Sequence, residues 1–382
     1  MADLSRLRRL LLAMLRPGPA DPALAGLNET QWQALDAMAA EHRLQPLLHA
    51  EWSGAARAAV VPPAILSGWA EAYRFATMAA LGQKGTLIAT MRLLDEAGMQ
   101  PIALKGAWLA WHAYAAPALR PMRDIDVLVR CDQALAAWHL LHDAGYTAPE
   151  GAPDQAAAAR DKHLPALITP SGVAVEIHSA CWETADQAGH PMPQPRDAAL
   201  RARAQHTDGV PYPAAQDMLA HLMVHAVYSH WLDVGPLVLT DIDALVRKAS
   251  PDWPQFWAEA KAEGWHKGAA LLLALAGHWR RPGLLQECRC PEPVPQALLD
   301  AAPDLMLQTM ERRAGARILA RLGRDGVGAA MQAKWAEAMR DPARAISLVG
   351  RRIRDLSAGL AHADARRKSA DMRDLGQWLL KG

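Results

Sequence analysis

The chain has 382 residues, of which 51% are hydrophobic, so it can bury a core large enough for more than one structural unit. Its formal net charge is +1 with acidic and basic residues well mixed, so bulk electrostatics indicate neither a nucleic-acid nor a membrane partner. No segment reaches the roughly 20 apolar residues of a membrane helix, and the N-terminal pattern fits an amphipathic helix ending before Pro17 rather than a signal peptide. We therefore expect a globular, cytoplasmic protein.

The first 98 residues have the periodicity of helices. Asn28 followed by Gln31 predicts a capping box at the start of one helix. Residues 64–97 predict one or two further helices that end at Gly98. We assign residues 1–74 to an N-terminal helical region.

Strand signals begin after this helical stretch. "MQPIALKG" is a short apolar run closed by Gly106, and "RDIDVLVR" alternates polar and apolar residues. "LITPSGVAVEIH" predicts two strands joined by a Pro-Ser-Gly turn. Between these segments, Asp132 is expected to cap a helix that Gly145 ends. These elements predict a small mixed sheet with helices packed on it, which we assign to residues 75–182.

A proline-rich linker, "GHPMPQPRD", leads into a mostly helical region assigned to residues 183–382. The predicted helices cover 214–230, 240–249, 253–263, 267–280, 296–322 and 328–377. Basic clusters in the last 70 residues are more typical of solvated helix faces than of RNA-binding surfaces. The predicted fold class is therefore α+β, with a small mixed β-sheet core and helices embedded in N- and C-terminal helical regions.

Two aspartates one residue apart, Asp124 and Asp126, lie in the alternating segment. Side chains of a strand point alternately to its two faces, so both carboxylates lie on the same face. Two like charges this close repel unless a cation neutralises them, and oxygen ligands favour Mg²⁺ or Mn²⁺. The alternative is a strand end whose aspartates cap backbone groups or pair with Arg120 and Arg123.

Other residues support a site for phosphoryl chemistry. Gly106 and Ala107 follow a strand and open a helix, where backbone N–H groups can hold phosphate. In "VAVEIH", Glu176 and His178 share one face of a second alternating strand. If the two strands pair, Glu176 becomes a third carboxylate beside the aspartates. Three carboxylates, metal ions and a glycine at a helix start are typical of phosphoryl transfer.

This order of elements resembles the nucleotidyltransferase superfamily related to DNA polymerase β. More narrowly, the chain resembles the bacterial family usually called uncharacterised nucleotidyltransferases, over roughly residues 30–280. The segments that carry this resemblance are "EHRLQPLL", "LKGAWLAWHAY", "LRPMRDIDVLV", "KHLPALI", "VEIHSACW", "LMVHAVYSHW" and "LTDIDALV".

The resemblance implies a role for five residues. Asp124 and Asp126 match the metal-binding pair, and Glu176 matches the third acid, which helps to activate the attacking hydroxyl; the three are the expected catalytic and metal-binding residues. Gly106 matches the signature glycine that lets phosphates approach the backbone. Ala107 stands where the family has Gly or Ser, so a hydroxyl contact to phosphate is absent.

Three basic residues beside this centre are candidates for nucleotide binding. Lys105 precedes Gly106, and Arg120 and Arg123 precede the aspartates, so each could neutralise a triphosphate. The alternative is that one arginine simply balances Asp124.

Histidines are the candidates for the acceptor side of the site. The resemblance covers His163 and His178, although a histidine on a strand is usually a hydrogen-bonded structural residue. His225, His230 and Asp241 belong to the helical half and could line a cleft or be buried.

These features predict a metal-dependent nucleotidyltransferase that moves a nucleoside monophosphate from an NTP to an acceptor hydroxyl and releases pyrophosphate. The expected partners are NTP, Mg²⁺ or Mn²⁺, and an acceptor that is a small molecule, peptide or protein rather than RNA, because overall neutrality disfavours nucleic-acid binding. One alternative is a catalytically silent scaffold that binds a nucleotide or a partner, although three mutually repelling acids argue against it. Another is a kinase-like phosphotransferase that uses the same metal site.

Overall fold

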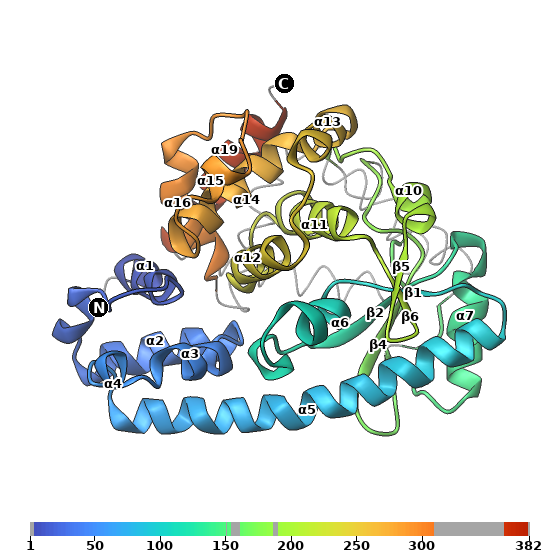
Figure 1. Ribbon diagram of the computed structural model, residues 1–382, viewed down its shortest axis with the longest axis horizontal. Helices are drawn as coiled ribbons and strands as arrows, with labels where there is room; N and C mark the ends of the chain where they lie inside the picture. The colour runs from blue at the N-terminus through green and yellow to red at the C-terminus, as the bar shows by residue number, and fades with distance from the viewer. Residues whose placement is uncertain (1–3, 150, 154–160, 186–189, 309–362, 381–382) are drawn as a thin grey trace.

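The computed structural model describes residues 4–149, 151–153, 161–185, 190–308 and 363–380. In Figure 1 a group of N-terminal helices lies at the left, a small sheet at the right and the C-terminal helices above them. This arrangement confirms the predicted α+β class, with a mixed sheet embedded between helical regions.

The N-terminal region contains five helices and a short 3₁₀ turn. Asn28 and Gln31 form the predicted capping box, in which each side chain accepts a hydrogen bond of 3.0 Å from the backbone N–H of the other residue. The helices are α1 (Leu4–Met14), α2 (Glu29–Glu41), α3 (Gln45–Trp52), α4 (Ala55–Ala58) and α5 (Pro63–Glu96), and the 3₁₀ turn is Pro22–Gly26.

Helix α5 connects the N-terminal helices to the sheet. It is a single helix of 34 residues, and Figure 1 shows it along the whole lower edge of the molecule. Its N-terminal half packs on α3, and its C-terminal half packs beneath the sheet. Residues 74 and 75, where the sequence places the border between the first two regions, both lie inside this helix.

The main sheet has four strands in the order β1-β2-β4-β3. β1 (Ile102–Ala103) runs antiparallel to β2 (Asp124–Leu128), β2 runs parallel to β4 (Ala174–His178), and β3 (Leu167–Ile168) runs antiparallel to β4. The predicted hairpin with the Pro-Ser-Gly turn is thus confirmed. In the β2–β4 pair, Asp126 lies opposite Glu176.

The two faces of this sheet differ in chemistry. Ile125, Val127, Val175 and Ile177 pack into one apolar cluster with α5 and with α7 (Ala134–Asp143). The polar residues of β2 and β4 therefore face the opposite side, as strand alternation requires. Between β1 and α7 along the chain lie the short helix α6 (Gly106–Trp108), a π-helical turn (Leu109–Ala113) and 3₁₀ turns at Pro117–Leu119 and Cys131–Gln133.

One predicted helix cap is wrong. The Asp132 side chain does not cap α7; both of its oxygens instead accept hydrogen bonds from the Arg130 guanidinium, at 3.0 and 2.9 Å. A 3₁₀ turn at Cys131–Gln133 precedes the helix, so Asp132 lies within that turn and not at the helix start. Gly145 ends the helix as predicted, with a φ of 96° that favours glycine.

The described elements of the C-terminal region are helices, apart from a two-stranded sheet that was not predicted, formed by β5 (Gln205–Thr207) and β6 (Val210–Tyr212). The predicted helix 328–377 and the second half of 296–322 fall largely outside the described residues. The helices are α10 (Asp197–Ala202), α11 (Ala215–Val224), the π-helical turn His225–Ser229, α12 (Leu237–Ala249), α13 (Trp253–Glu263), α14 (His266–Trp279), α15 (Leu284–Glu287), α16 (Gln296–Met306) and α19 (Ala363–Leu380).

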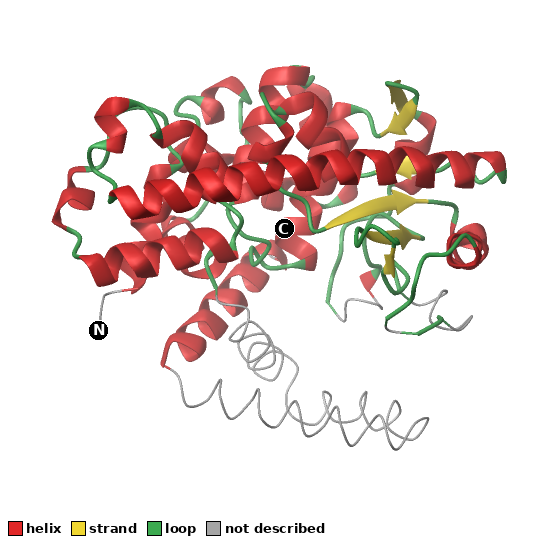
Figure 2. Cartoon of the chain, turned by 90° about the horizontal axis from the view of Figure 1, so that it is seen from below, coloured by secondary structure: helices red, strands yellow, loops and turns green. Residues whose placement is uncertain are grey.

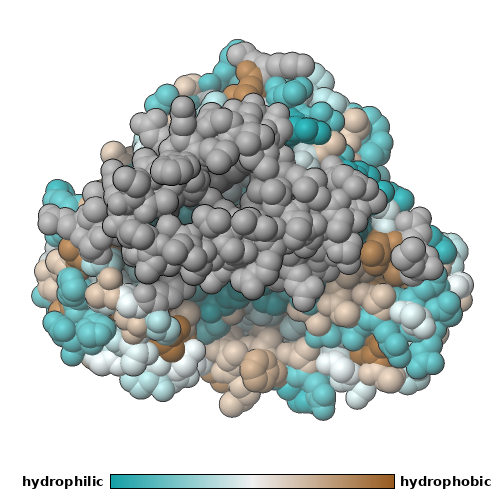
Figure 3. Space-filling model, turned by 180° about the vertical axis from the view of Figure 1, so that it is seen from behind, coloured by the Kyte–Doolittle hydropathy of each residue, from teal (hydrophilic) through white to brown (hydrophobic). Residues whose placement is uncertain are grey.

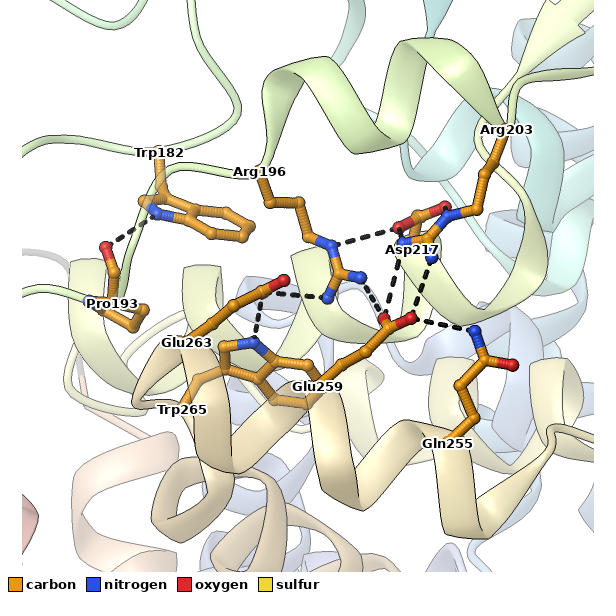
Figure 4. Close-up of polar contacts among 9 residues, drawn as sticks. All are labelled: Trp182, Pro193, Arg196, Arg203, Asp217, Gln255, Glu259, Glu263 and Trp265. Atoms are coloured by element: carbon orange, nitrogen blue, oxygen red, sulfur yellow. Dashed lines mark hydrogen bonds and ion pairs between the residues drawn. The ribbon is translucent and has the colours of Figure 1, made fainter.

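Buried ion pairs fasten α10 to its neighbours (Figure 4). Arg196, whose side chain is fully buried, pairs with Asp217 at the start of α11 at 3.0 Å and with Glu263 of α13 at 3.1 Å, and it also contacts Glu259. Arg203 pairs with the same Asp217 and Glu259. Each buried charge thus has an opposite charge beside it, which offsets its desolvation and gives these helices a defined relative position.

No helix in the described part of the chain is both long enough and apolar enough to cross a membrane.

Candidate functional site

A pocket of about 310 Å³ opens over the polar face of the sheet. Residues after β1, on β2 and on β4 form one wall, and the C-terminal helices α11 and α12 form the other. Every predicted site residue except Ala107 lines this pocket: Lys105, Gly106, Arg120, Arg123, Asp124, Asp126, His163, Glu176, His178 and His225.

Asp126, Glu176 and His178 form the centre of the pocket wall. His178 Nε2 lies 2.8 Å from Asp126 Oδ1 and 3.7 Å from Glu176 Oε2. His163, which forms an isolated bridge with the backbone of His178, places its Nδ1 3.7 Å from the same Glu176 oxygen. Asp126 lies in the middle of β2, and Glu176 and His178 lie on β4 about 50 positions further along the chain; the three meet because β2 and β4 pair in parallel.

Both oxygens of Asp126 have a partner. Lys105 Nζ lies 3.1 Å from Oδ2, and His178 takes the other oxygen. Burial by itself raises the pKa of Asp126, but the Lys105 charge and His178 more than offset it and hold this pKa well below its usual range. Burial lowers the pKa of His178 and Asp126 raises it, with a net increase. Asp126 is therefore ionised, and its charge is neutralised by the chain itself.

Asp124 has a different environment. Burial, together with the charges of Asp126 and Glu176, raises the pKa of Asp124 to about 6. Burial also raises the pKa of Glu176, but the nearby imidazoles of His178 and His163 give a net decrease. Asp124 thus experiences the repulsion that the D-x-D spacing predicts.

The donor atoms in this centre fit a divalent cation. One ligand atom each from Asp126, Glu176 and His178 lie within 4.8 Å of one another. Carboxylate oxygens suit Mg²⁺ and Mn²⁺, and imidazole nitrogen is a common ligand of transition metals. Asp124 lines the same pocket but is not one of the three residues whose ligand atoms lie closest together. His178 is the third member of that group, where the sequence predicts Asp124.

Arg120 is balanced by an aspartate of the C-terminal region. Its guanidinium binds Asp241 of α12 through Nε at 3.2 Å and Nη2 at 3.0 Å. The Tyr114 hydroxyl donates to the same carboxylate at 2.8 Å. The sequence allowed an arginine to balance Asp124, but the carboxylate that Arg120 binds is that of Asp241, 121 residues along the chain.

The need for glycine at position 106 comes from Arg120. A Cβ atom on Gly106 would lie 2.5 Å from Arg120 Nη1 and 2.9 Å from Met122 Sδ. Ala107 packs instead into the apolar cluster beneath the sheet, and its N–H donates to the Leu104 carbonyl at 3.3 Å. Lys105, directly before this pair, has φ 45° and ψ −112°, a strained backbone conformation for a residue other than glycine.

Sequence reasoning missed two basic residues of the pocket, Arg43 and Lys162. Arg43 comes from the loop between α2 and α3 and donates to the Pro121 carbonyl at 3.1 Å, while its buried Nε has no hydrogen-bond partner among the described residues. Burial and the charges of Arg120 and Arg123 lower the pKa of Arg43 to about 10. The only signal was that both residues lie in segments that carry the family resemblance, "EHRLQPLL" and "KHLPALI".

The opposite wall combines imidazoles with apolar side chains. His225 begins the π-helical turn after α11, a type of turn that is frequent at functional sites, and its ring centroid lies 4.3 Å from that of His230. Burial and the nearby charge of Lys105 hold the pKa of His225 well below its usual range, so this imidazole is neutral. Leu222 and Val238 complete the apolar part of the wall.

Comparison with protein families finds one match. The model of a family described as "Uncharacterised nucleotidyltransferase" matches residues 28–281, which run from the cap of α2 to the end of α14. No curated protein and no solved structure matches the chain.

Proposed function

The chain belongs to the family of uncharacterised nucleotidyltransferases and is therefore a transferase, and we propose that it moves a nucleoside monophosphate from an NTP to an acceptor hydroxyl. The observation that carries the proposal is the pairing of Asp126 with Glu176 on parallel strands, in a pocket that also presents basic residues. Acids alone would hold a cation; acids beside several arginines and lysines fit a cation together with a polyphosphate.

The proposed reaction forms one bond and breaks one. The acceptor oxygen bonds to the α-phosphorus of the NTP, and the bond between that phosphorus and the oxygen bridging to the β-phosphate breaks. The electron pair of the broken bond leaves with pyrophosphate, and the acceptor proton passes to a base, for which Glu176 is the candidate. Catalysis of this kind rests mainly on positioning and charge neutralisation.

Asp124, Asp126 and Glu176 are the proposed metal-holding residues, with His178 beside them. A bound Mg²⁺ or Mn²⁺ would supply positive charge at the reacting phosphate oxygens. Because Lys105 pairs with Asp126, its ammonium must leave that carboxylate when a cation is bound. A nearby triphosphate would offer Lys105 a new partner.

The triphosphate is proposed to lie against Arg43, Arg123 and Lys105. Arg43 Nε has no hydrogen-bond partner in the described part of the chain, and Arg123 is exposed at the pocket, so both have donors to offer a phosphate. Arg120 is already bound to Asp241 and acts instead by orienting this wall.

The acceptor is proposed to enter along the wall formed by α11 and α12. Its apolar side chains and the neutral imidazole of His225 suit a small molecule, or a peptide or protein side chain, better than the charged backbone of RNA.

The test is calorimetric titration of the protein with each NTP, with and without Mg²⁺ or Mn²⁺, for the wild type and for Asp124→Ala/Asp126→Ala. We expect metal-dependent NTP binding that the double variant loses. Candidate acceptors are then screened by identifying the product released from the NTP. Pyrophosphate supports nucleotidyl transfer, whereas a nucleoside diphosphate means phosphoryl transfer. Failure of every NTP to bind would contradict the proposal and favour a silent scaffold.

A further inference from the structure

Helix α5 exposes large hydrophobic side chains in the middle of its length. Phe75 is 77% exposed, Met78 69%, Leu81 56% and Ile88 50%. Only Leu4 and Leu380 are comparable elsewhere in the described residues. Figure 2 shows this long helix across the near side of the molecule, and Figure 3 shows tan, hydrophobic residues at the middle of the lower edge, along which α5 runs.

Between Arg74 and Arg92 the one charged residue of α5 is Lys84, which is half-buried and lies over the Trp111 ring. The exposed residues of α5 between these two arginines are apolar or small: Phe75, Met78, Ala79, Leu81, Gly82, Gly85 and Ile88. The side of the helix that faces the protein already has its own buried residues, among them Leu87, Met91 and Leu94. The outer residues belong to none of the apolar clusters formed by the described residues, and such a contiguous apolar surface marks an interaction site.

The residues on this surface are arranged symmetrically. Glu71, Met78, Gly85 and Arg92 recur every seven residues, so they form one stripe along the helix. Reversing the helix about the point between Leu81 and Gly82 exchanges Glu71 with Arg92 and Met78 with Gly85. The same operation exchanges Phe75 with Ile88 and Leu81 with Gly82.

We propose that this α5 face, from Glu71 to Arg92, binds the same face of a second copy of the chain, with the two helices antiparallel about a two-fold axis. Three pairs of facing residues then fit together on each side of the two-fold axis. Leu81 and Met78 of one copy lie against Gly82 and Gly85 of the other, which lets the helices approach closely, and Phe75 lies against Ile88. The contact extends for about 32 Å at 1.5 Å per residue.

Charge complementarity identifies the occupant. At each end of the contact, Glu71 of one copy meets Arg92 of the other, so the pair is formed twice by symmetry, as an isologous interface requires. The Arg92 side chain is 72% exposed, and its Nε is 3.8 Å from Glu96 Oε1 of the same helix, a loose contact. Its guanidinium can therefore turn towards Glu71 of the second copy. Exposed Glu71, Asp95 and Glu96 balance exposed Arg74 and Arg92 and half-buried Lys84, so this part of α5 has no excess positive charge with which to bind an anionic lipid surface.

The test is sedimentation equilibrium of the full chain over a range of concentrations. The wild type should dimerise. Glu71→Arg and Arg92→Glu should each weaken the dimer about tenfold or more, because each places two like-charge pairs in the interface, and the double variant Glu71→Arg/Arg92→Glu should restore it. A monomeric wild type, or a double variant no better than the single ones, would overturn the proposal.

A matched pair of variants tests the apolar centre. Leu81→Glu places two carboxylates near the axis and should abolish dimerisation, whereas Leu380→Glu changes an equally exposed leucine on α19 and should not. Equal effects of the two variants, or none from Leu81→Glu, would contradict the assigned face. A wild type that stays monomeric and sediments with phosphatidylcholine–phosphatidylglycerol vesicles would identify lipid as the occupant instead.

Discussion

Lys105 Nζ lies 3.1 Å from Asp126 Oδ2, so the carboxylate at the centre of the site is neutralised by a residue that is itself in a strained backbone conformation. The two residues belong to different elements, and Lys105 directly precedes Gly106 at the start of α6. A cation bound at Asp126 must compete with this ammonium. The ion pair therefore weakens metal binding. A nucleotide that attracts Lys105 away from Asp126 should strengthen it again.

Replacing Lys105 with methionine should raise the affinity for Mn²⁺ in the absence of nucleotide by about tenfold, because the competing charge is gone. The same variant should bind NTP more weakly. Electron paramagnetic resonance of free Mn²⁺ measures the first effect and calorimetry the second. Lys84→Met, which changes a lysine stacked on Trp111, is the matched control and should alter neither. Weaker Mn²⁺ binding in Lys105→Met would show that Lys105 does not compete.

Asp126→Asn removes the central charge but keeps the size of the side chain. Metal-dependent NTP turnover should fall by more than about 100-fold. Loss of a residue that only hydrogen-bonds to a metal ligand already lowers activity by about 10–100-fold, and loss of the ligand itself should lower it at least as much. The control is Asp132→Asn, which changes an exposed aspartate paired only with Arg130 in the described structure and should leave turnover unchanged. Circular dichroism establishes that both variants fold. A folded Asp126→Asn protein with normal turnover is incompatible with the proposed role.

Gly106→Ala should disrupt the pocket because the new Cβ would lie 2.5 Å from Arg120 Nη1. Arg120 would have to shift, and its two hydrogen bonds to Asp241 would weaken. We expect lower thermal stability and weaker NTP binding. Gly277→Ala in α14 meets only ordinary contacts of 3.8–4.0 Å and should be neutral or stabilise by about 0.5–1 kcal/mol, as alanine favours helix. The prediction fails if the two variants have the same melting temperature.

Glu183 provides a pH-dependent contribution to stability. Its carboxylate lies 2.8 Å from Lys162 and accepts a hydrogen bond from Ser229 at 2.7 Å. Burial raises the pKa of Glu183, but Lys162 outweighs it and lowers this pKa from 4.5 to about 2. The stabilisation is then fully present above pH 4.5 and is lost as the pH falls towards 2.

Urea unfolding of the wild type and Glu183→Gln at several pH values measures this contribution. The difference in unfolding free energy should be roughly 2 kcal/mol at pH 7, with allowance for partial solvent screening, and should shrink steadily below pH 4.5. A difference that stays constant with pH would mean that packing, and not the ion pair, explains the effect of the substitution.

Local patterns in the sequence determined the features that depend on near neighbours. The capping box of Asn28 and Gln31 follows from three-residue spacing, and the alternation in β2 and β4 placed Asp124, Asp126, Glu176 and His178 on the polar face of the sheet. Such features can be predicted because a helix turn and a strand pleat are set within a few residues. Asp132 shows the limit of this reasoning, since an arginine two residues away competes for the carboxylate.

Only the tertiary structure decided which distant residues meet. Parallel pairing of β2 and β4 in one register places Asp126 opposite Glu176, and a shift of one residue would have turned Glu176 to the apolar side. The same holds for Arg43, which enters the pocket from the N-terminal helices, and for Asp241, which binds Arg120 from α12. These contacts depend on how strands pair and how whole helices pack against the sheet, and residue periodicity carries no information about partners that are distant in the sequence.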